Sequence, residues 1–165
     1  MTLRIWIRHE TRDTERRAPV VPADAATLVA AGAQVTVEES PQRVFGIEEY
    51  AAAGAAVAPA GSWVEADPDW YVVGLKELPE TPRSLRHRHV YFGHAYKGQP
   101  GADALLRRFA GGDGALLDIE YLVDETGRRL AAFGYWAGYA GAALTVLHHR
   151  GELETPLTPL PRADL

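Results

Sequence analysis

Basic and acidic side chains follow the apolar segments of this sequence at short distances. The segment GLKELPE places Lys76 and Glu77 shortly after WYVVG, and GHAYKGQPG places His94 and Lys97 shortly after HVYF. A histidine titrates near neutral pH, and a neighbouring cation lowers the pKa of a lysine. The spacing therefore makes these side chains candidates for general acid–base catalysis.

Arginines and carboxylates follow other apolar segments. Arg17 lies in the charged loop after the first of them, and Arg128 and Arg129 begin the segment GRRLAAFG after a turn. A guanidinium matches a carboxylate with two parallel hydrogen bonds, so these arginines are candidates for holding a substrate carboxylate. LLDIEYL spaces Asp118 and Glu120 two apart, which on a strand would set both on one face.

Each of these residues also has an ordinary interpretation. A lysine in a turn is usually a solvated charge, and paired arginines after a turn usually decorate a surface. A single histidine among strand residues is more often a hydrogen-bonded structural residue than a base. Their convergence favours a site, because Lys76, His94 and Lys97 are all expected at one edge of one sheet.

Other chemistries find little support. The sequence has no cysteine, which excludes disulfides, cysteine catalysis and thiolate metal sites. It has no GxSxG elbow, P-loop or GxGxxG loop, and the glycines of residues 111–114 are expected to form a turn. The pairs His87/His89 and His148/His149 lack carboxylates at ligand spacing. We expect them to be solvated basic residues and predict no metal site.

The elements that position these residues alternate along the chain. Patterns of apolar residues predict strands at 3–7, 34–38, 55–58, 70–74, 89–93, 115–122 and 129–133, and helices at 22–31, 47–53, 103–110 and 134–149. This order favours an α/β fold, a three-layer αβα Rossmann-like domain with a mostly parallel sheet. The carboxyl ends of its strands would share one edge, where ligands bind in such folds.

Composition and charge limit the remaining function classes. The chain has 165 residues, 47% of them hydrophobic, which suits a globular domain at 1–150; the proline-containing residues 151–165 are expected to form a tail or linker. A net charge of -5 disfavours nucleic acid and anionic membranes as partners. The charged N-terminus is unlike a secretory signal, and the apolar stretch at 131–147 is too interrupted for a membrane span. A cytoplasmic protein is expected.

Seven segments together resemble one known family. ERRAPVVP, VEESPQRVFGIEEYAAAGA, APAGSW, GLKELPE, FGHAYKGQ, LLDIEYL and GRRLAAFGYWAGYAGAAL occur in this order within residues 1 to about 150. The sequence resembles the N-terminal domain of the NAD-dependent, lysine-forming saccharopine dehydrogenase family, which belongs with alanine dehydrogenase and the transhydrogenase N-terminal domains. The resemblance implies an oxidoreductase of lysine metabolism that cleaves saccharopine reversibly to lysine and 2-oxoglutarate through an imine.

The resemblance also implies roles for individual residues. The family's acid–base lysine and histidine correspond to Lys76 and His94, and Lys97 corresponds to a lysine that tunes the site. Glu77 and Glu120 match glutamates that moderate the charge of these basic groups. The arginines that hold substrate carboxylates match Arg17 and either Arg128 or Arg129.

The resemblance raises the question of where NAD binds. The family continues into a Rossmann domain, whereas this sequence has no dinucleotide fingerprint and reaches Leu165 in a proline-rich stretch. We expect NAD to be bound by a partner Rossmann subunit and not by this chain alone, in a split enzyme. Residues 134–149 are the expected contact, since Gly134, Gly138 and Gly141 give that helix a small-residue face.

Three alternatives remain open. The domain could work alone as a non-redox imine or carbinolamine catalyst, or as an amino-acid-binding module. It could be a degenerate domain with a structural role only. A homodimer could form through the helix at 134–149 without any NAD-binding protein. In the catalytic cases the small-molecule substrate is an amino acid with a 2-oxo acid.

Overall fold

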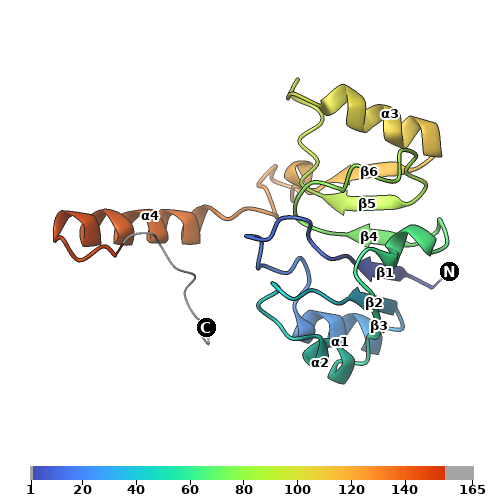
Figure 1. The fold of residues 1–165 in the computed structure, drawn as a ribbon, viewed down its shortest axis with the longest axis horizontal. Coiled ribbons are helices and arrows are strands. Elements are labelled where there is room, and N and C mark those ends of the chain that lie inside the picture. The colour runs from blue at the N-terminus through green and yellow to red at the C-terminus, as the bar shows by residue number, and fades with distance from the viewer. Residues whose placement is uncertain (1, 155–165) are drawn as a thin grey trace. The chain divides into compact units, whose positions relative to one another are not determined.

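A six-stranded parallel sheet organises the first of two compact units in the computed structural model, which describes residues 2–154 and divides between Leu122 and Val123 (Figure 1). The strands are β1 (Arg4–Ile7), β2 (Gln34–Glu38), β3 (Ala56–Ala58), β4 (Tyr71–Val73), β5 (Arg88–Tyr91) and β6 (Ala115–Asp118). Their order in the sheet is β3-β2-β1-β4-β5-β6, and every neighbouring pair is parallel. The α/β class and the parallel sheet predicted from the sequence are confirmed.

Helices cover both faces of this sheet. They are α1 (Pro22–Ala30), α2 (Ile47–Ala52) and α3 (Ala102–Gly112), with the 3-10 helices η1 (Ser62–Glu65) and η2 (Ile119–Tyr121). On one face Ile5 and Ile7 pack with residues of α1 and α2, including Tyr50. On the other face Trp63 of η1 and Phe109 of α3 pack over the sheet. Alternate strand residues point to opposite faces, so the unit has three layers.

A buried carboxylate joins the second core, which is the group of side chains packed around Trp63 and Phe109, to the strand ends. Glu38, at the end of β2, is 0% exposed. It accepts hydrogen bonds from Trp6 Nε1 (3.0 Å) and from the backbone amides of His9 (2.8 Å), Gly61 (2.9 Å) and Trp63 (2.7 Å). A buried charge is tolerated when its oxygens are hydrogen-bonded in this way. Glu38 therefore fixes η1 and the loop after β1 to the sheet.

The expectation that His87 and His89 are solvated is wrong. His87 is 1% exposed and His89 0% exposed, and both rings pack edge-on against Trp63. His89 is register partner of Val72 in β4, so it points into the core beneath α3, where Phe109 also contacts it. Burial, together with the charge of His87 and of nearby arginines, lowers the pKa of His89 to about 3. His89 is therefore a neutral core residue.

Two predicted strands differ from the structure. The segment predicted as a strand at 115–122 ends at Asp118, whose Oδ1 accepts the amide of Glu120 (3.0 Å) and starts η2. Asp118 and Glu120 therefore do not share a strand face. No strand forms at 129–133; Arg129 makes only an isolated antiparallel bridge with Val123. The connecting turn is closed instead by the Asp124 side chain, which accepts the amide of Arg128 (3.0 Å).

The second unit contains this turn and the helix α4 (Gly134–His149), whose bounds match the prediction. Its aromatic side chains are largely exposed, with Tyr135 at 77%, Trp136 at 53% and Tyr139 at 64%. Among the described residues, no helix is long and apolar enough to cross a membrane. Most of the predicted tail at 151–165 lies outside the described residues.

Candidate active site

The candidate residues of the first unit follow four strands that are consecutive in the sheet, β1, β4, β5 and β6. Arg17 lies in the loop after β1, and Lys76 with Glu77 in the loop after β4. His94 with Lys97 lies in the loop after β5, and Glu120 lies in η2 after β6. All four strands are parallel, so these loops leave the same edge of the sheet.

The first group of charges, the Glu15 cluster, consists of Arg17, Glu15 and Lys76. Arg17 holds the Glu15 carboxylate with two hydrogen bonds, Nε to Oε1 at 2.8 Å and Nη2 to Oε2 at 2.5 Å. Lys76 Nζ lies 4.0 Å from Glu15 Oε2. Burial alone would raise the pKa of Glu15, but hydrogen bonds and charge from Arg17, with the charge of Lys76, hold that pKa below its ordinary value. Glu15 therefore stays ionised.

The second group, the Glu120 cluster, consists of His94, Glu120 and Lys97. Lys97 Nζ lies 2.7 Å from Glu120 Oε1, and His94 Nδ1 lies 3.4 Å from Glu120 Oε2. The Glu120 side chain is 14% exposed, whereas His94 and Lys97 are more than half exposed. A largely buried carboxylate thus orients two solvent-facing basic groups. The arrangement resembles that of the Glu15 cluster, in which a carboxylate also lies between two basic residues.

The backbone at His94 adopts an uncommon conformation. Its φ of 49° is in the left-handed region, which non-glycine residues seldom occupy. The preceding Gly93 passes so close to β6 that a Cβ there would lie 2.8 Å from a methyl group of Leu116. The Phe92 ring stacks on the imidazole at 6.3 Å between centroids. Strained backbone of this kind concentrates at functional sites.

Glu77 pairs with a residue that the sequence did not single out. Arg12 donates from Nε to Oε2 (2.8 Å) and from Nη2 to Oε1 (2.6 Å) of Glu77. Burial would raise the pKa of Glu77, but its own amide, Arg12 and the charge of Lys76 together lower it. Glu77 is therefore a carboxylate that acts electrostatically on Lys76 while bound to Arg12.

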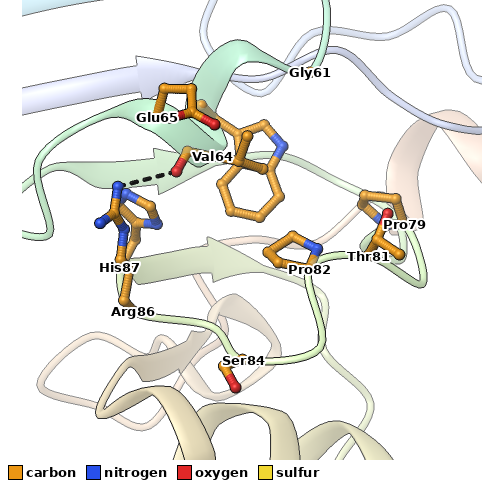
Figure 2. A pocket seen from close by; sticks show the side chains of 10 residues that line it. Gly61, Val64, Glu65, Pro79, Thr81, Pro82, Ser84, Arg86 and His87 are labelled. Atoms are coloured by element: carbon orange, nitrogen blue, oxygen red, sulfur yellow. Dashed lines mark hydrogen bonds between the residues drawn. The ribbon is translucent and has the colours of Figure 1, made fainter.

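Two cavities differ in what lines them. One of about 420 Å³ is lined by Glu77, Tyr91, His94 and Arg108, among others, so it opens onto the candidate site. The larger, of about 610 Å³, lies between η1 and the segment 79–87 (Figure 2). In it Arg86 donates to the Val64 carbonyl oxygen at 3.1 Å, and none of the predicted acid–base residues lines it. The smaller cavity is the one connected with the candidate chemistry.

Comparison with known proteins identifies the family of this chain. The model of the family "Alanine dehydrogenase/PNT, N-terminal domain" matches residues 6–140. The chain belongs to this family. The match includes every candidate residue of the first unit, from Arg17 to Glu120, and also Arg128 and Arg129.

Curated relatives of this alanine dehydrogenase/PNT domain include lysine-forming, NAD(+)-dependent saccharopine dehydrogenases. That of Emericella nidulans is 48% identical over 93% of this chain and 41% of its own length, and that of Neurospora crassa 51% identical over 86% and 38%. The mitochondrial alpha-aminoadipic semialdehyde synthase of Rattus norvegicus is 30% identical over 87% of this chain and 15% of its own length. The chain therefore spans about two fifths of the saccharopine dehydrogenases that it matches.

Solved structures of the family share the fold. A transhydrogenase from Sinorhizobium meliloti superposes with a TM-score of 0.60 at 19% identity, over 74% of this chain and 35% of its own. An L-alanine dehydrogenase superposes with a TM-score of 0.59 at 20% identity, over 75% and 34%. At this identity the likeness establishes the fold alone.

The two remaining arginine candidates of this family member lie in the second unit. The Arg128 amide donates to Asp124 Oδ1, and Arg129 Nη2 donates to the Ala131 carbonyl oxygen at 3.3 Å. Both side chains are exposed. Within its unit the structure shows a turn that presents two guanidinium groups to solvent, and their role in binding a carboxylate stays a prediction.

Proposed function

We propose that this chain supplies the substrate-binding and acid–base part of a saccharopine-dehydrogenase-like oxidoreductase. The reaction is the NAD-dependent cleavage, or reductive formation, of a secondary amine between an amino acid and 2-oxoglutarate. The observation that carries the proposal is the pair of carboxylate-bridged clusters at one sheet edge, with Lys76 and His94 in the loops after neighbouring strands. An imine reaction needs two such groups, one at the amine nitrogen and one for water.

Lys76 is assigned to the nitrogen. It accepts the proton of the secondary amine as the C–N bond is oxidised to an imine. Its ammonium then lies 4.0 Å from the ionised Glu15, which stabilises the charge that Lys76 acquires. The Arg17 side chain, bound to the same carboxylate and 49% exposed, is placed to orient a substrate carboxylate beside it.

His94 is assigned to the water. Lys76 gives its proton to the imine nitrogen while His94 takes a proton from the water molecule that adds to the imine carbon, which forms a carbinolamine. His94 returns that proton to the nitrogen as the C–N bond breaks, and Lys76 takes the hydroxyl proton as the carbonyl forms, so the products are an amine and a 2-oxo acid. Glu120 Oε2, 3.4 Å from Nδ1, orients the ring for this step.

NAD does not fit this sheet in the manner of a Rossmann domain. The connection from β1 to α1, residues 8–21, contains no glycine, and α1 begins with Pro22, which lacks an amide proton. A pyrophosphate therefore finds no glycine-rich turn at the start of this helix. Bound elsewhere, NAD would accept the hydride from the amine carbon.

We propose that a separate Rossmann domain supplies NAD in trans and docks on α4. The support is the exposed aromatic surface of that helix, formed by Tyr135, Trp136 and Tyr139. Glycines at 134, 138 and 141 would also let another backbone approach closely. A second copy of this chain bound through the same helix is the competing arrangement, and the mass of the complex in solution distinguishes the two.

The site assignment is tested with Lys76→Met and His94→Gln in the presence of an NAD-binding domain. Each is expected to lower kcat for saccharopine oxidation by at least about a hundredfold, the range that general acid–base groups contribute. Arg107→Met is the matched control, since it removes an exposed cation of α3 outside both clusters. Full activity of either site variant, or equal loss in the control, contradicts the assignment.

The stand-alone alternative has one observation in its favour, since both clusters form within the first unit. It requires turnover or binding of an amino acid and 2-oxo acid without any nicotinamide. Calorimetry with such pairs, and borohydride trapping of an imine adduct on the chain, would reveal it. Heat and adducts that persist in Lys76→Met and His94→Gln would exclude this use of the clusters.

A further inference from the structure

A buried ion pair lies just outside the Glu15 cluster. Arg8 and Glu10 follow β1, and their side chains are 1% and 4% exposed. Arg8 Nη1 lies 3.2 Å from Glu10 Oε2. The desolvation of two buried charges can exceed their mutual attraction, so such a pair is a poor source of stability. Its contacts indicate another use.

The pair forms hydrogen bonds with the backbone of Leu75 and Lys76. Glu10 Oε1 accepts the amide of Leu75 at 2.6 Å, and Glu10 Oε2 accepts the amide of Lys76 at 3.0 Å. Arg8 Nη2 donates to the carbonyl oxygen of Lys76. The amide and the carbonyl of the candidate base are thus both bound by side chains that are 66 to 68 residues away in sequence.

The Arg8 guanidinium is confined on two sides by its neighbours. A Cβ at Gly74 would come within 2.4 Å of Arg8 Nε, so the guanidinium occupies the space that a side chain would need. On the other side Arg8 lies over the ring of Tyr91, with Cζ 5.8 Å from the centroid. The loop after β2 adds a hydrogen bond from Gln42 Nε2 to the Glu10 carbonyl oxygen at 2.7 Å.

We propose that the Arg8–Glu10 pair is a positioning device for Lys76. It fixes the backbone at Leu75 and Lys76 so that the lysine side chain, 35% exposed, stays opposite Glu15. The inference rests on the proposed function in one respect, namely that Lys76 is the proton acceptor. Arg8 and Glu10 act through the main chain and have no contact with substrate assigned to them.

The sequence offers an internal reference for the test. Lys76 and Lys97 are the only lysines in the chain, so selective ¹⁵N-lysine labelling gives two backbone amide signals. The Lys76 amide donates to Glu10, and the Lys97 amide donates to Gln99 Oε1 at 2.8 Å. Reductive ¹³C-methylation likewise reports each lysine side chain separately.

In Glu10→Gln the amide group of the new side chain cannot satisfy both backbone amides and Arg8. We expect exchange of the Lys76 amide proton at least about tenfold faster, because a hydrogen bond to a charged group is lost. The methyl signal of Lys76 should also move, while both Lys97 signals stay in place. Glu38→Gln is the matched control, since it alters another buried carboxylate without a contact to Lys76.

Arg8→Met combined with Glu10→Gln serves where the single variant does not fold, because it leaves no unpaired buried charge. Unchanged Lys76 signals in a folded variant overturn the proposal, and so does failure of both variants to fold, which would make the pair purely structural. The proposal is also overturned if the Lys76 signals change as much in Glu38→Gln as in Glu10→Gln.

Kinetics with an NAD-binding domain separate this inference from the proposed function. A folded variant should lose kcat by at least about tenfold with KM changed less than about threefold, since proton transfer and not binding is disturbed. Displaced Lys76 signals with no activity in the unmodified chain would retain the positioning role and reject the dehydrogenase. An unchanged kcat despite displaced signals would reject the positioning role in catalysis.

Discussion

At the scale of single residues, the site is defined by carboxylates as much as by bases. Glu15 and Glu120 each lie between two basic groups, and of these two carboxylates only Glu120 was a candidate from the sequence. Lys76, His94 and Lys97 could be selected because they follow apolar segments. Which loop charge meets which depends on strand order, so Glu15 could not be recognised as the partner of Lys76. Arg8, Glu10 and Arg12 were missed for that reason.

The strained backbone of His94 gives a residue-scale prediction. Asparagine tolerates the left-handed region, whereas a β-branched side chain does not. We expect His94→Asn to keep or raise the free energy of unfolding and His94→Val to lower it by about 1 kcal/mol or more. Denaturant unfolding of the two variants checks this, and both should be inactive. Equal stability of the two variants would show that the residue is not strained.

At the scale of elements, the alternation of predicted strands and helices was enough to predict a parallel sheet. The bounds of β2 and α4 agree with the predicted ranges, and those of β1, α1 and α2 differ by one residue. The predictions that failed did so because of local side-chain hydrogen bonds or because of tertiary packing. An Asp118 side chain ends β6, and the Asp124 side chain closes a turn in place of a strand. His89 was misjudged because a polar residue type conceals a core position under α3.

Acid sensitivity of the second core follows from His89. Its pKa is about 3 in the folded protein against an ordinary value of 6.5, so between these values the unfolded chain binds the extra proton. Stability from this residue is present above pH 6.5 and is lost as the pH falls, by about 1.4 kcal/mol for each pH unit.

The check is to measure unfolding at several pH values in the original chain and in His89→Phe. The variant should show a weaker fall in stability between pH 6.5 and pH 4. A parallel fall in both proteins would assign the acid sensitivity to other groups, such as the carboxylates of Glu15 and Glu77. Their pKa values are lowered in the folded protein, so they too make it more stable at higher pH.

At the scale of the whole molecule, the chain is an alanine dehydrogenase/PNT domain whose curated relatives are more than twice its length. Its acid–base clusters lie in one compact unit, and the exposed aromatic helix α4 lies in the other. In the proposed function, proton chemistry takes place on this sheet and hydride chemistry on a second domain. The surface of α4 is where the proposed association can be tested.

Charges on α4 should separate association from folding. Trp136→Glu with Tyr139→Glu is expected to abolish binding of an NAD-binding domain, because charged groups would have to be buried in the interface. The melting of the first unit should be unchanged. His148→Glu, on the same helix but away from these aromatics in sequence, is the control. Sedimentation analysis gives the mass, and a homodimer disrupted by the same pair would favour self-association instead.

The proposed division between two proteins is tested by mixing this chain with the isolated NAD-binding domain of a saccharopine dehydrogenase and following NADH formation from saccharopine. We expect saccharopine-dependent reduction of NAD by the mixture and none by either protein alone, with equal amounts of 2-oxoglutarate and lysine released. Stable association of the two proteins without any reduction of NAD, or reduction that survives Lys76→Met and His94→Gln together, would contradict it.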